Sequence, residues 1–292
     1  MKLSLGPIPY YWPRETLFEF YEKIGRTSVD IVYLGETVCS RRHAFRFDDW
    51  LEVAKSLSHA GKEAVLSSQT LIESDSDLKA LRRLAENGEF PVEANEMGAV
   101  NLLSGKPFVA GPHLNIYNPE ALEILSELGA KRWVMPVEMS KQALSETIPE
   151  MMETEVFVHG RLPLAYSARC FTARHYNLPK DDCRFSCLDH PFGLPLRTRE
   201  GEPFLALNGI QTQSYRLCNL IAELDEMAKL GVGIARISPQ PMHTEKIVAL
   251  FREALEGRIE GGMASSMISD LVPFETCNGY WRGRSGMEYM EG

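Results

Sequence analysis

The stretch DIVYLGETVCSRRHAFRFDDWLEVAKSLSHAGKEAVLSS, residues 30–68, indicates the fold class most directly. It opens with a short apolar and β-branched run, IVYL, and closes with a second one, AVLS. Between these runs, the segment DWLEVAKSLSHAGK has the apolar spacing of an amphipathic helix. A strand, a crossover helix and a second strand in this order predict two parallel neighbouring strands.

The same unit recurs along the whole chain. Strand-like runs alternate with helix-like segments such as RETLFEFYEKIG and TEKIVALFREALEG. Eight strand-like runs are present: KLSLG (2–6), DIVYLG (30–35), EAVLSS (63–68), FPVEA (90–94), PFVAG (107–111), RWVMPV (132–137), TEVFVHG (154–160) and GIARISP (233–239). They predict an α/β fold, a (β/α)8 TIM-like barrel made by residues 1–292 as a single domain. A doubly wound open sheet has a similar local pattern and stays open as an alternative.

One long segment interrupts the alternation after the seventh strand. Residues 161–203 show no regular pattern, and the run FLALNGIQTQS (204–214) that follows predicts a β-hairpin. Loops of this length are uncommon unless they carry a function or are held together internally. We therefore expect residues 161–203 to be an insertion, held together by cysteines that bind a metal or a cluster.

Composition narrows the class of protein. The chain has 40 acidic and 31 basic residues, a net charge of −9, and no basic stripe that would follow a phosphate backbone, so nucleic acid is not an expected partner. No apolar run is long enough to span a membrane, and Pro7, Pro9 and Pro13 break any continuous helix near the N-terminus. We expect a cytoplasmic protein, in which clustered cysteines are more often metal ligands or catalytic thiols than disulfides.

Three of the six cysteines lie within CFTARHYNLPKDDCRFSC, residues 170–187. Cys183 and Cys187 are four residues apart, the spacing that places two side chains on one helix face. A tetrahedral or cubane site normally takes four thiolates. Besides Cys170, the expected fourth is Cys39, because the loop after the second strand opens on the same barrel face as the insertion. Spacing alone leaves zinc and a 4Fe-4S cluster both open.

The other two cysteines have a different expected place. Cys218 lies in QSYRLCNLIAELDEMAKLG, which we read as an amphipathic helix, and Cys277 has no thiol neighbour in the sequence. Because free cysteine is among the most commonly buried residues, Cys218 is assigned to the core, and Cys277 is expected to be a buried or incidental thiol rather than a ligand.

Polar side chains follow most of the predicted strands, at the barrel face where active sites form. Each one alone is typical of a loop or a helix cap, but together they predict a polar mouth that holds a small hydrophilic molecule. Candidates for orienting a substrate or moving protons are Glu36, Arg41, Glu93, His113, Asn115 and Glu138, and the ring is completed by Ser68, His159, Asn208 and Ser238.

The run EVFVHGRLPLAYSARC, residues 155–170, resembles the signature of the collagenase-like peptidase family U32. Longer blocks resemble the members of this family that belong to ubiquinone biosynthesis. These blocks are LGPIPYYWPRE (5–15), DIVYLGETVCSRR (30–42), LPLAYSARCFTAR (162–174), LNGIQTQS (207–214), RISPQ (236–240) and CNGYWRG (277–283), and they span nearly the whole chain.

The resemblance implies a subunit that hydroxylates the aromatic ring of ubiquinone precursors without dioxygen. It implies a 4Fe-4S cluster on Cys39, Cys170, Cys183 and Cys187, the set that spacing also selects, and prephenate as the hydroxyl donor. The implied partners are the paralogue UbiU, in a heterodimer, and a lipid-carrying accessory protein. Since four thiolates on four irons leave no open iron, we expect the cluster to transfer electrons rather than to bind substrate.

One departure bears on activity: the broader family signature has a cysteine where this chain has Pro163. No Ser, Cys or Thr lies beside a histidine base in a recognisable motif, so proteolysis is not expected. A U32-type peptidase, with or without zinc, stays as an alternative. A second alternative is a partner subunit whose zinc or cluster only stabilises the insertion.

Overall fold

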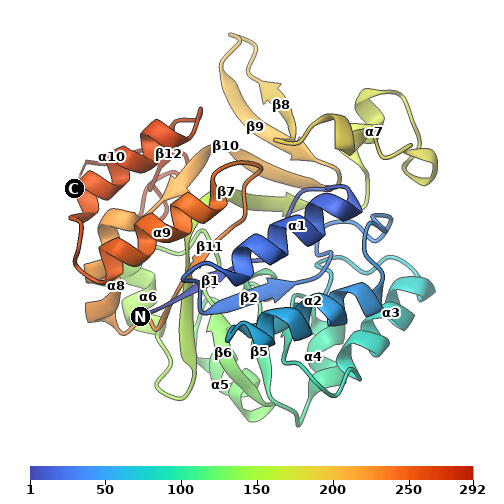
Figure 1. Cartoon of the computed structure of the whole chain (residues 1–292), viewed down its shortest axis with the longest axis horizontal. Coiled ribbons are helices and arrows are strands. Elements are labelled where there is room, and N and C mark those ends of the chain that lie inside the picture. The colour runs from blue at the N-terminus through green and yellow to red at the C-terminus, as the bar shows by residue number, and fades with distance from the viewer. Residues whose placement is uncertain (292) are drawn as a thin grey trace.

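A closed barrel of eight parallel strands is the centre of the computed structural model, which describes residues 1–291 (Figure 1). The barrel strands are β1 (Lys2–Leu5), β2 (Ile31–Leu34), β3 (Glu63–Ser67), β4 (Val92–Ala94), β5 (Phe108–Ala110), β6 (Ala130–Val134), β7 (Glu153–Tyr166) and β11 (Ile234–Ile237). They pair in the order β11-β1-β2-β3-β4-β5-β6-β7, and β11 pairs with β7 to close the ring. The predicted (β/α)8 barrel and its eight strands are confirmed.

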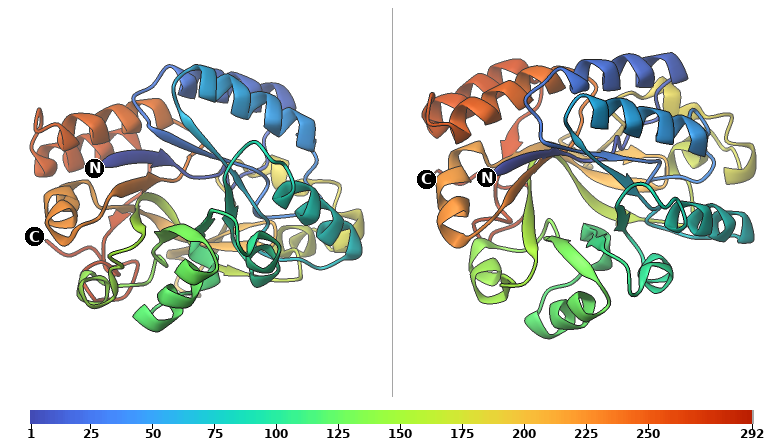
Figure 2. Two further views of the ribbon diagram at one scale, coloured as in Figure 1. Left: turned by 90° about the horizontal axis from the view of Figure 1, so that it is seen from below. Right: turned by 60° about the horizontal axis from the view of Figure 1, so that its bottom comes forward.

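Helices surround the barrel (Figure 2). They are α1 (Arg14–Gly25), α2 (Phe47–His59), α3 (Asp75–Ala85), α4 (Met97–Leu103), α5 (Pro119–Glu127), α6 (Lys141–Thr147), α8 (Leu224–Leu230), α9 (Thr244–Leu255) and α10 (Gly261–Leu271), with short 3-10 turns η1 (Pro112–Leu114) and η4 (Ile221–Glu223). Several begin at a side-chain cap: Ser74, Asn118 and Ser140 each accept a hydrogen bond from a backbone N–H in the first turn of α3, α5 and α6. The main apolar core lies between the strands and these helices.

Strand β7 is much longer than its neighbours, because it continues beyond the barrel to Tyr166. Its outer part pairs antiparallel with β10 (Gln211–Asn219). Strand β10 pairs in turn with β9 (Pro203–Asn208), and β9 pairs with β8 (Leu194–Arg197). This arm projects from the barrel at the top of Figure 1. The predicted hairpin is therefore confirmed, but residues 161–166, expected to be irregular, are strand.

Cys218 lies on β10 rather than on a helix, so the predicted helix there is wrong. The strand forms because β10 pairs with β7 on one side and with β12 (Thr276–Cys277) on the other. Cys218 and Cys277 are directly opposite each other in the β10–β12 pair, and both are buried. The core assignment of Cys218 is confirmed, and Cys277 is buried with Cys218 as its neighbour on the adjacent strand.

The cysteine-bearing segment between β7 and β8 contains helix α7 (Phe171–His175) and two 3-10 turns, η2 (Lys180–Asp182) and η3 (Ser186–Asp189). Between the two turns, Arg184 and Phe185 are in the left-handed region, with φ of 50° and 52°. Two consecutive left-handed residues end a right-handed helix. Cys183 and Cys187 therefore do not share a helix face, and the spacing argument for that pair is wrong.

Within residues 1–291, no helix has both the length and the apolar composition that crossing a membrane requires.

Candidate functional site

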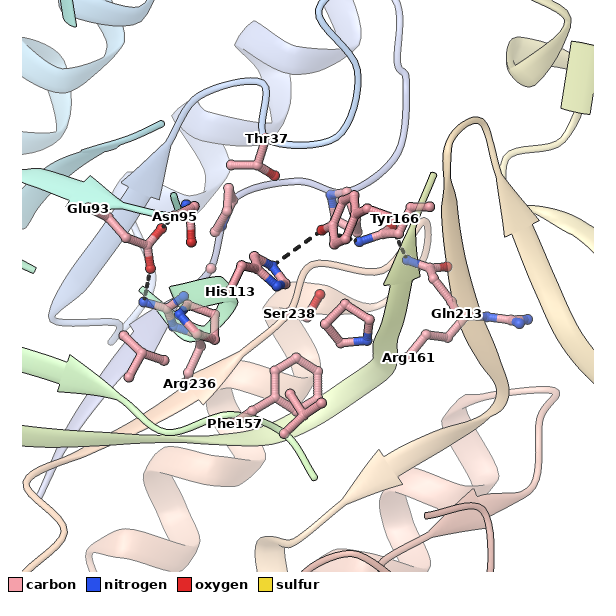
Figure 3. A pocket seen from close by; sticks show the side chains of 18 residues that line it. Thr37, Glu93, Asn95, His113, Phe157, Arg161, Tyr166, Gln213, Arg236 and Ser238 are labelled. Atoms are coloured by element: carbon pink, nitrogen blue, oxygen red, sulfur yellow. Dashed lines mark hydrogen bonds and ion pairs between the residues drawn. The ribbon is translucent and has the colours of Figure 1, made fainter. Parts of the chain in front are cut away.

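A cavity lies at the C-terminal ends of the barrel strands, as predicted for the working face (Figure 3). It encloses about 50 Å³ and is walled by the apolar side chains of Val134, Phe157 and Pro163. Its polar lining comes from different elements: Glu93 on β4 and Asn95 just after it, His113 on η1, Arg161 and Tyr166 on β7, Gln211 and Gln213 on β10, and Arg236 on β11 with Ser238 just after it. We call this space the inner cavity.

A second space of about 300 Å³ adjoins it and is lined in addition by Thr70, Asn115, Glu138 and Leu164. Both spaces share His113, Tyr166 and Pro163 in their walls. We call this second space the outer cavity. It meets the inner cavity at His113 and Tyr166, whose rings are in edge-to-face contact with their centroids 4.9 Å apart.

Beneath the inner cavity, a buried ionic network fixes Arg236. Its Nε donates to Glu155 at 2.7 Å, and its Nη2 lies 2.8 Å from a Glu93 oxygen. Glu155 is fully buried and also accepts hydrogen bonds of 2.5 Å from both Ser4 and Tyr33. Burial disfavours its charge, but the neighbouring arginines, Arg236 foremost, outweigh this and lower the pKa of Glu155. Two carboxylates thus already balance the charge of Arg236.

Arg161 is the second buried arginine of the inner cavity and, unlike Arg236, has no carboxylate partner in residues 1–291. Its side chain is 2% exposed, its Nη1 donates to the Ser214 carbonyl at 3.0 Å, and its Nε has no hydrogen-bond partner among residues 1–291. It lies over the rings of Phe274 and Tyr215, at 4.5 and 5.0 Å from their centroids. Within residues 1–291 no carboxylate lies within salt-bridge distance of it, and burial lowers its pKa. A buried, unpaired guanidinium at a cavity wall is suited to binding an anion.

Acceptor atoms without partners lie in the same lining. Asn95 Oδ1 and Gln213 Oε1 are buried and accept no hydrogen bond from residues 1–291. Buried polar atoms are nearly always paired, by protein, water or ligand. The inner cavity therefore offers both a charged donor and neutral acceptors, which matches a small molecule that carries a carboxylate and a hydroxyl group.

His113 and Tyr166 are both neutral at the boundary of the two cavities. Burial, together with the charge of Arg236, lowers the pKa of His113 to about 3. Burial raises the pKa of Tyr166 to about 12. The hydroxyl of Tyr166 lies 3.3 Å from His113 Nε2. Proton uptake by this histidine is therefore suppressed near neutral pH, and the pair acts through hydrogen bonds.

The predicted cysteine ligands lie on the neighbouring loops. Cys39 is buried with Val38 and Ile210, and Cys170 packs against this group. The segment that carries Cys187 contacts α7, which begins just after Cys170. Burial raises the pKa of Cys187, while the positive charge of Arg42 opposes the shift. The long segment thus folds back to the loop after β2, as expected.

The predicted site residues Glu36 and Arg41 do not line the inner cavity. They fix the loop after β2 and connect it to the cysteine-bearing segment. Glu36 accepts hydrogen bonds of 3.0 Å from the backbone N–H groups of Val38 and Cys39, and therefore fixes the turn that carries Cys39. Arg41 donates to the Asp181 carbonyl at 2.6 Å and ties the loop after β2 to the cysteine-bearing segment.

No three His, Cys, Asp or Glu side chains among residues 1–291 are placed to hold one metal ion. Four sulfur ligands of a single zinc ion at about 2.3 Å would lie within about 4 Å of one another. The thiols of a cubane cluster each bind a different iron and are spaced more widely.

The remaining candidates divide between the cavities. Glu93 and Ser238 line the inner cavity, Asn115 and Glu138 the outer one, and His113 both. Ser68 supports Asn95 by accepting its backbone N–H at 2.9 Å. Asn208 and His159 are the exceptions, because neither lines a cavity. Asn208 donates to the Pro9 carbonyl and to Gln211, and the His159 ring lies 6.0 Å from the Phe251 ring of α9. A β-bulge in the pairing of β7 with β11 shifts the alternation there, so the prediction that His159 lines the mouth is wrong.

The profile of peptidase family U32 matches residues 18–290. The chain belongs to peptidase family U32. This U32 protein is 20% identical over 246 residues to the tRNA hydroxylation protein P1 of Bacillus subtilis (strain 168). The alignment covers 82% of the chain and 51% of that relative, so the chain spans about half the length of the relative it matches.

Solved structures resemble this U32 protein only weakly. Dihydropteroate synthase from Thermus thermophilus is 12% identical, with a TM-score of 0.41, covering 88% of this chain and 93% of its own. The spore cortex-lytic enzyme SleL from Bacillus cereus is 12% identical, with a TM-score of 0.42, covering 87% of this chain and 75% of its own. No conclusion is drawn from likenesses at this level.

Several residues of the inner cavity were not among the sequence candidates. Arg161 and Tyr166 belong to the U32-like run 155–170, so the sequence did mark this region. They were not chosen as site residues because the strand was expected to end at residue 160, whereas β7 continues to Tyr166. Arg236, Gln211 and Gln213 lie within strands, and nothing in their local sequence separates them from ordinary strand residues. Pro163 lines both cavities.

Proposed function

We propose that this chain is a counterpart of the ubiquinone-biosynthesis protein UbiV, a subunit of an oxygen-independent hydroxylase of ubiquinone precursors. It acts as a heterodimer with a UbiU-like paralogue and receives its substrate with the lipid-carrying accessory protein of the pathway. A 4Fe-4S cluster is bound by Cys39, Cys170, Cys183 and Cys187. The observation that carries the proposal is membership of family U32 together with similarity to a hydroxylation protein.

The donor set supports a cluster. All four cysteines are free thiols. Cys39 and Cys170 pack in one group, and Cys187 is close enough for the charge of Cys170 to raise its pKa. Together with the absence of a single-ion site in residues 1–291, this arrangement favours the cluster over structural zinc. When bound there, the cluster would supply one-electron transfer.

The inner cavity is proposed to hold the hydroxyl donor. Prephenate carries carboxylates and a hydroxyl group, and Arg161 provides the uncompensated positive charge for one carboxylate. Asn95 and Gln213 provide free acceptors for the hydroxyl group. Because about 50 Å³ holds only part of such a molecule, its ring extends into the outer cavity of about 300 Å³. Arg236 positions the floor through Glu93 and Glu155 instead of binding the donor.

Replacing Arg161 by methionine tests this assignment. The change removes the charge and keeps much of the side-chain length, so the protein is expected to fold while binding of the donor falls at least tenfold. Binding of prephenate is measured by calorimetry without oxygen, and hydroxylation is measured with the paralogue present. Arg197→Met, at an exposed position on β8, is the matched control. Unchanged prephenate affinity in Arg161→Met would contradict the assignment.

Proteolysis is the competing function, because the family is named for it. Within residues 1–291, no Ser, Thr or Cys side chain forms a hydrogen bond with a histidine ring; the histidine partners are Tyr166, Tyr176 and a backbone carbonyl. The nucleophile and base pair of a peptidase is therefore not assembled. Cleavage of casein or collagen by the purified chain, abolished by one point substitution, would support the peptidase instead.

A further inference from the structure

A chain of buried hydrogen bonds leads from Arg42, in the loop after β2, to the two cavities. Arg42, whose charge lies close enough to Cys187 to oppose the rise in the pKa of that thiol, donates from Nη2 to Asn208 Oδ1 at 2.7 Å. Asn208 Nδ2 donates to Gln211 Oε1 at 3.0 Å, and Gln211 Nε2 donates to the Tyr166 hydroxyl at 2.6 Å. The Tyr166 hydroxyl lies 3.3 Å from His113 Nε2. The first three of these residues are at most 4% exposed.

The direction of this relay is fixed at its first amide. Arginine has only donors, so the Asn208 atom that faces Arg42 must be the oxygen. A backbone carbonyl has only acceptors, so the Asn208 atom 2.7 Å from the Pro9 oxygen must be the nitrogen. Two independent neighbours therefore select the same orientation of the Asn208 amide.

The same logic continues along the relay. Because Asn208 presents its NH₂ group to Gln211, the facing atom of Gln211 is the oxygen, which also accepts from Gln213 at 2.9 Å. The Gln211 nitrogen is then left to donate to Tyr166. Tyr166 accepts this bond, and its own proton must go to another acceptor.

His113 Nε2 is that acceptor. In residues 1–291, the Tyr166 hydroxyl hydrogen-bonds Gln211 and His113, whereas the Thr70 hydroxyl has no hydrogen-bond partner and does not take the Tyr166 proton. A ring nitrogen that accepts a hydrogen bond carries no proton, so the proton of the neutral imidazole is on Nδ1. In residues 1–291, no group accepts a hydrogen bond from His113 Nδ1, and the ring lines both cavities.

We propose that Arg42 fixes His113 as the Nδ1–H tautomer through Asn208, Gln211 and Tyr166, and that His113 donates this N–H to an oxygen of the molecule bound at the mouth. Arg42, Asn208 and Gln211 are positioning residues in this scheme, and His113 is the residue that touches the ligand. The identity of the ligand rests on the proposed function, whereas the tautomer and its control by Arg42 do not.

Burial and Arg236 also keep His113 neutral, with a pKa of about 3, so the imidazole donates without first taking up a proton. A neutral imidazole N–H aimed at a reacting oxygen polarises it without a change in net charge. Because the charge of Arg42, the first donor of the relay, also acts on the pKa of Cys187, the relay that ends at the ligand-binding N–H begins beside the thiol region.

The tautomer can be read directly from imidazole ¹⁵N chemical shifts in two-bond nitrogen–proton correlation spectra of the full chain. The chain has seven histidines, and His113→Gln assigns the signal. The wild type is expected to show Nδ1–H. In Gln211→Glu, the new carboxylate has only acceptors, so Tyr166 must donate to it and accept from His113, and the signal should change to Nε2–H. Gln142→Glu, on the exposed surface of α6, makes the same substitution outside the relay.

Tyr166→Phe is the second variant, since it removes only the hydroxyl group and should release the ring from the Nδ1–H form. A wild-type signal of Nε2–H would overturn the proposal. Persistence of Nδ1–H in both variants would show that the relay does not set the tautomer, which overturns it equally. Failure of the cluster or of ring hydroxylation would refute the proposed function and leave these spectra unaffected.

Discussion

Replacing Glu155 by glutamine removes the most buried charge of the barrel with little change in shape. The carboxylate is fully buried, 2.7 Å from Arg236 Nε, and accepts from Ser4 and Tyr33 at 2.5 Å. In the variant, the amide nitrogen cannot accept, so at least one of these donors loses its partner. Arg236 also keeps only one of its two carboxylates, Glu93.

Breaking a buried ion pair from one side costs about 3 to 5 kcal/mol. Because Glu93 remains 2.8 Å from Arg236, the lower end of that range applies, about 3 kcal/mol. The matched control is Glu153→Gln, whose side chain is 43% exposed and pairs with Arg132 and Lys2. A partly exposed pair of this kind contributes about 0 to 1 kcal/mol.

Urea unfolding followed by circular dichroism gives both free energies of unfolding. Since the pKa of Glu155 is lowered from 4.5, its charge stabilises the fold above that pH and the stabilisation is lost as pH falls through the folded-state pKa. The difference in free energy of unfolding between wild type and Glu155→Gln should therefore become smaller at acidic pH. Equal losses for Glu155→Gln and Glu153→Gln at pH 7 would refute the view that the buried network holds Arg236.

Three further outcomes follow from the same structure. The pKa of His159 is lowered by burial from 6.5 to about 4, so the unfolded chain takes up its proton first and about 3 kcal/mol of stability is lost between those pH values; urea unfolding of His159→Gln should show a shallower pH dependence. In Gly35→Ala, with φ of 144°, the new Cβ would lie 2.5 Å from a β3 carbonyl oxygen, and thermal unfolding should show a loss of about 3 kcal/mol or more. Gly61→Ala, with φ of 80° in open space, should lose only about 1 kcal/mol. Arg41→Ala removes the bond to Asp181, so trypsin should cleave the cysteine-bearing segment faster than in wild type.

The barrel could be predicted because its information is local. Each strand is a short apolar run, such as IVYL at 31–34 with all four residues buried, followed by an amphipathic helix, and eight such units leave few architectures. The irregular region was harder. The pairing of Cys218 with β7 and β12 is non-local, and its sequence looked helical because apolar residues recur at a helical spacing there.

The site residues likewise divide into those that local sequence predicts and those that depend on contacts between distant segments. Strand-end polar residues such as Glu93 and His113 were found because strand ends mark the barrel mouth. The relay residues Gln211 and Asn208 come from a hairpin that folds over the mouth, and their meeting with Arg42 depends on tertiary contacts that no spacing rule contains. His159 was misplaced because a bulge changes which face of β7 it occupies.

The central claim is that four cysteines of this chain hold a 4Fe-4S cluster. The direct measurement is the iron, acid-labile sulfide and zinc content of protein purified without oxygen, for wild type, Cys183→Ala and Cys218→Ala. About four irons and four sulfides per chain in wild type and in Cys218→Ala, lost in Cys183→Ala, is the expected result. One zinc without iron, or an iron content that Cys183→Ala leaves unchanged, would contradict it.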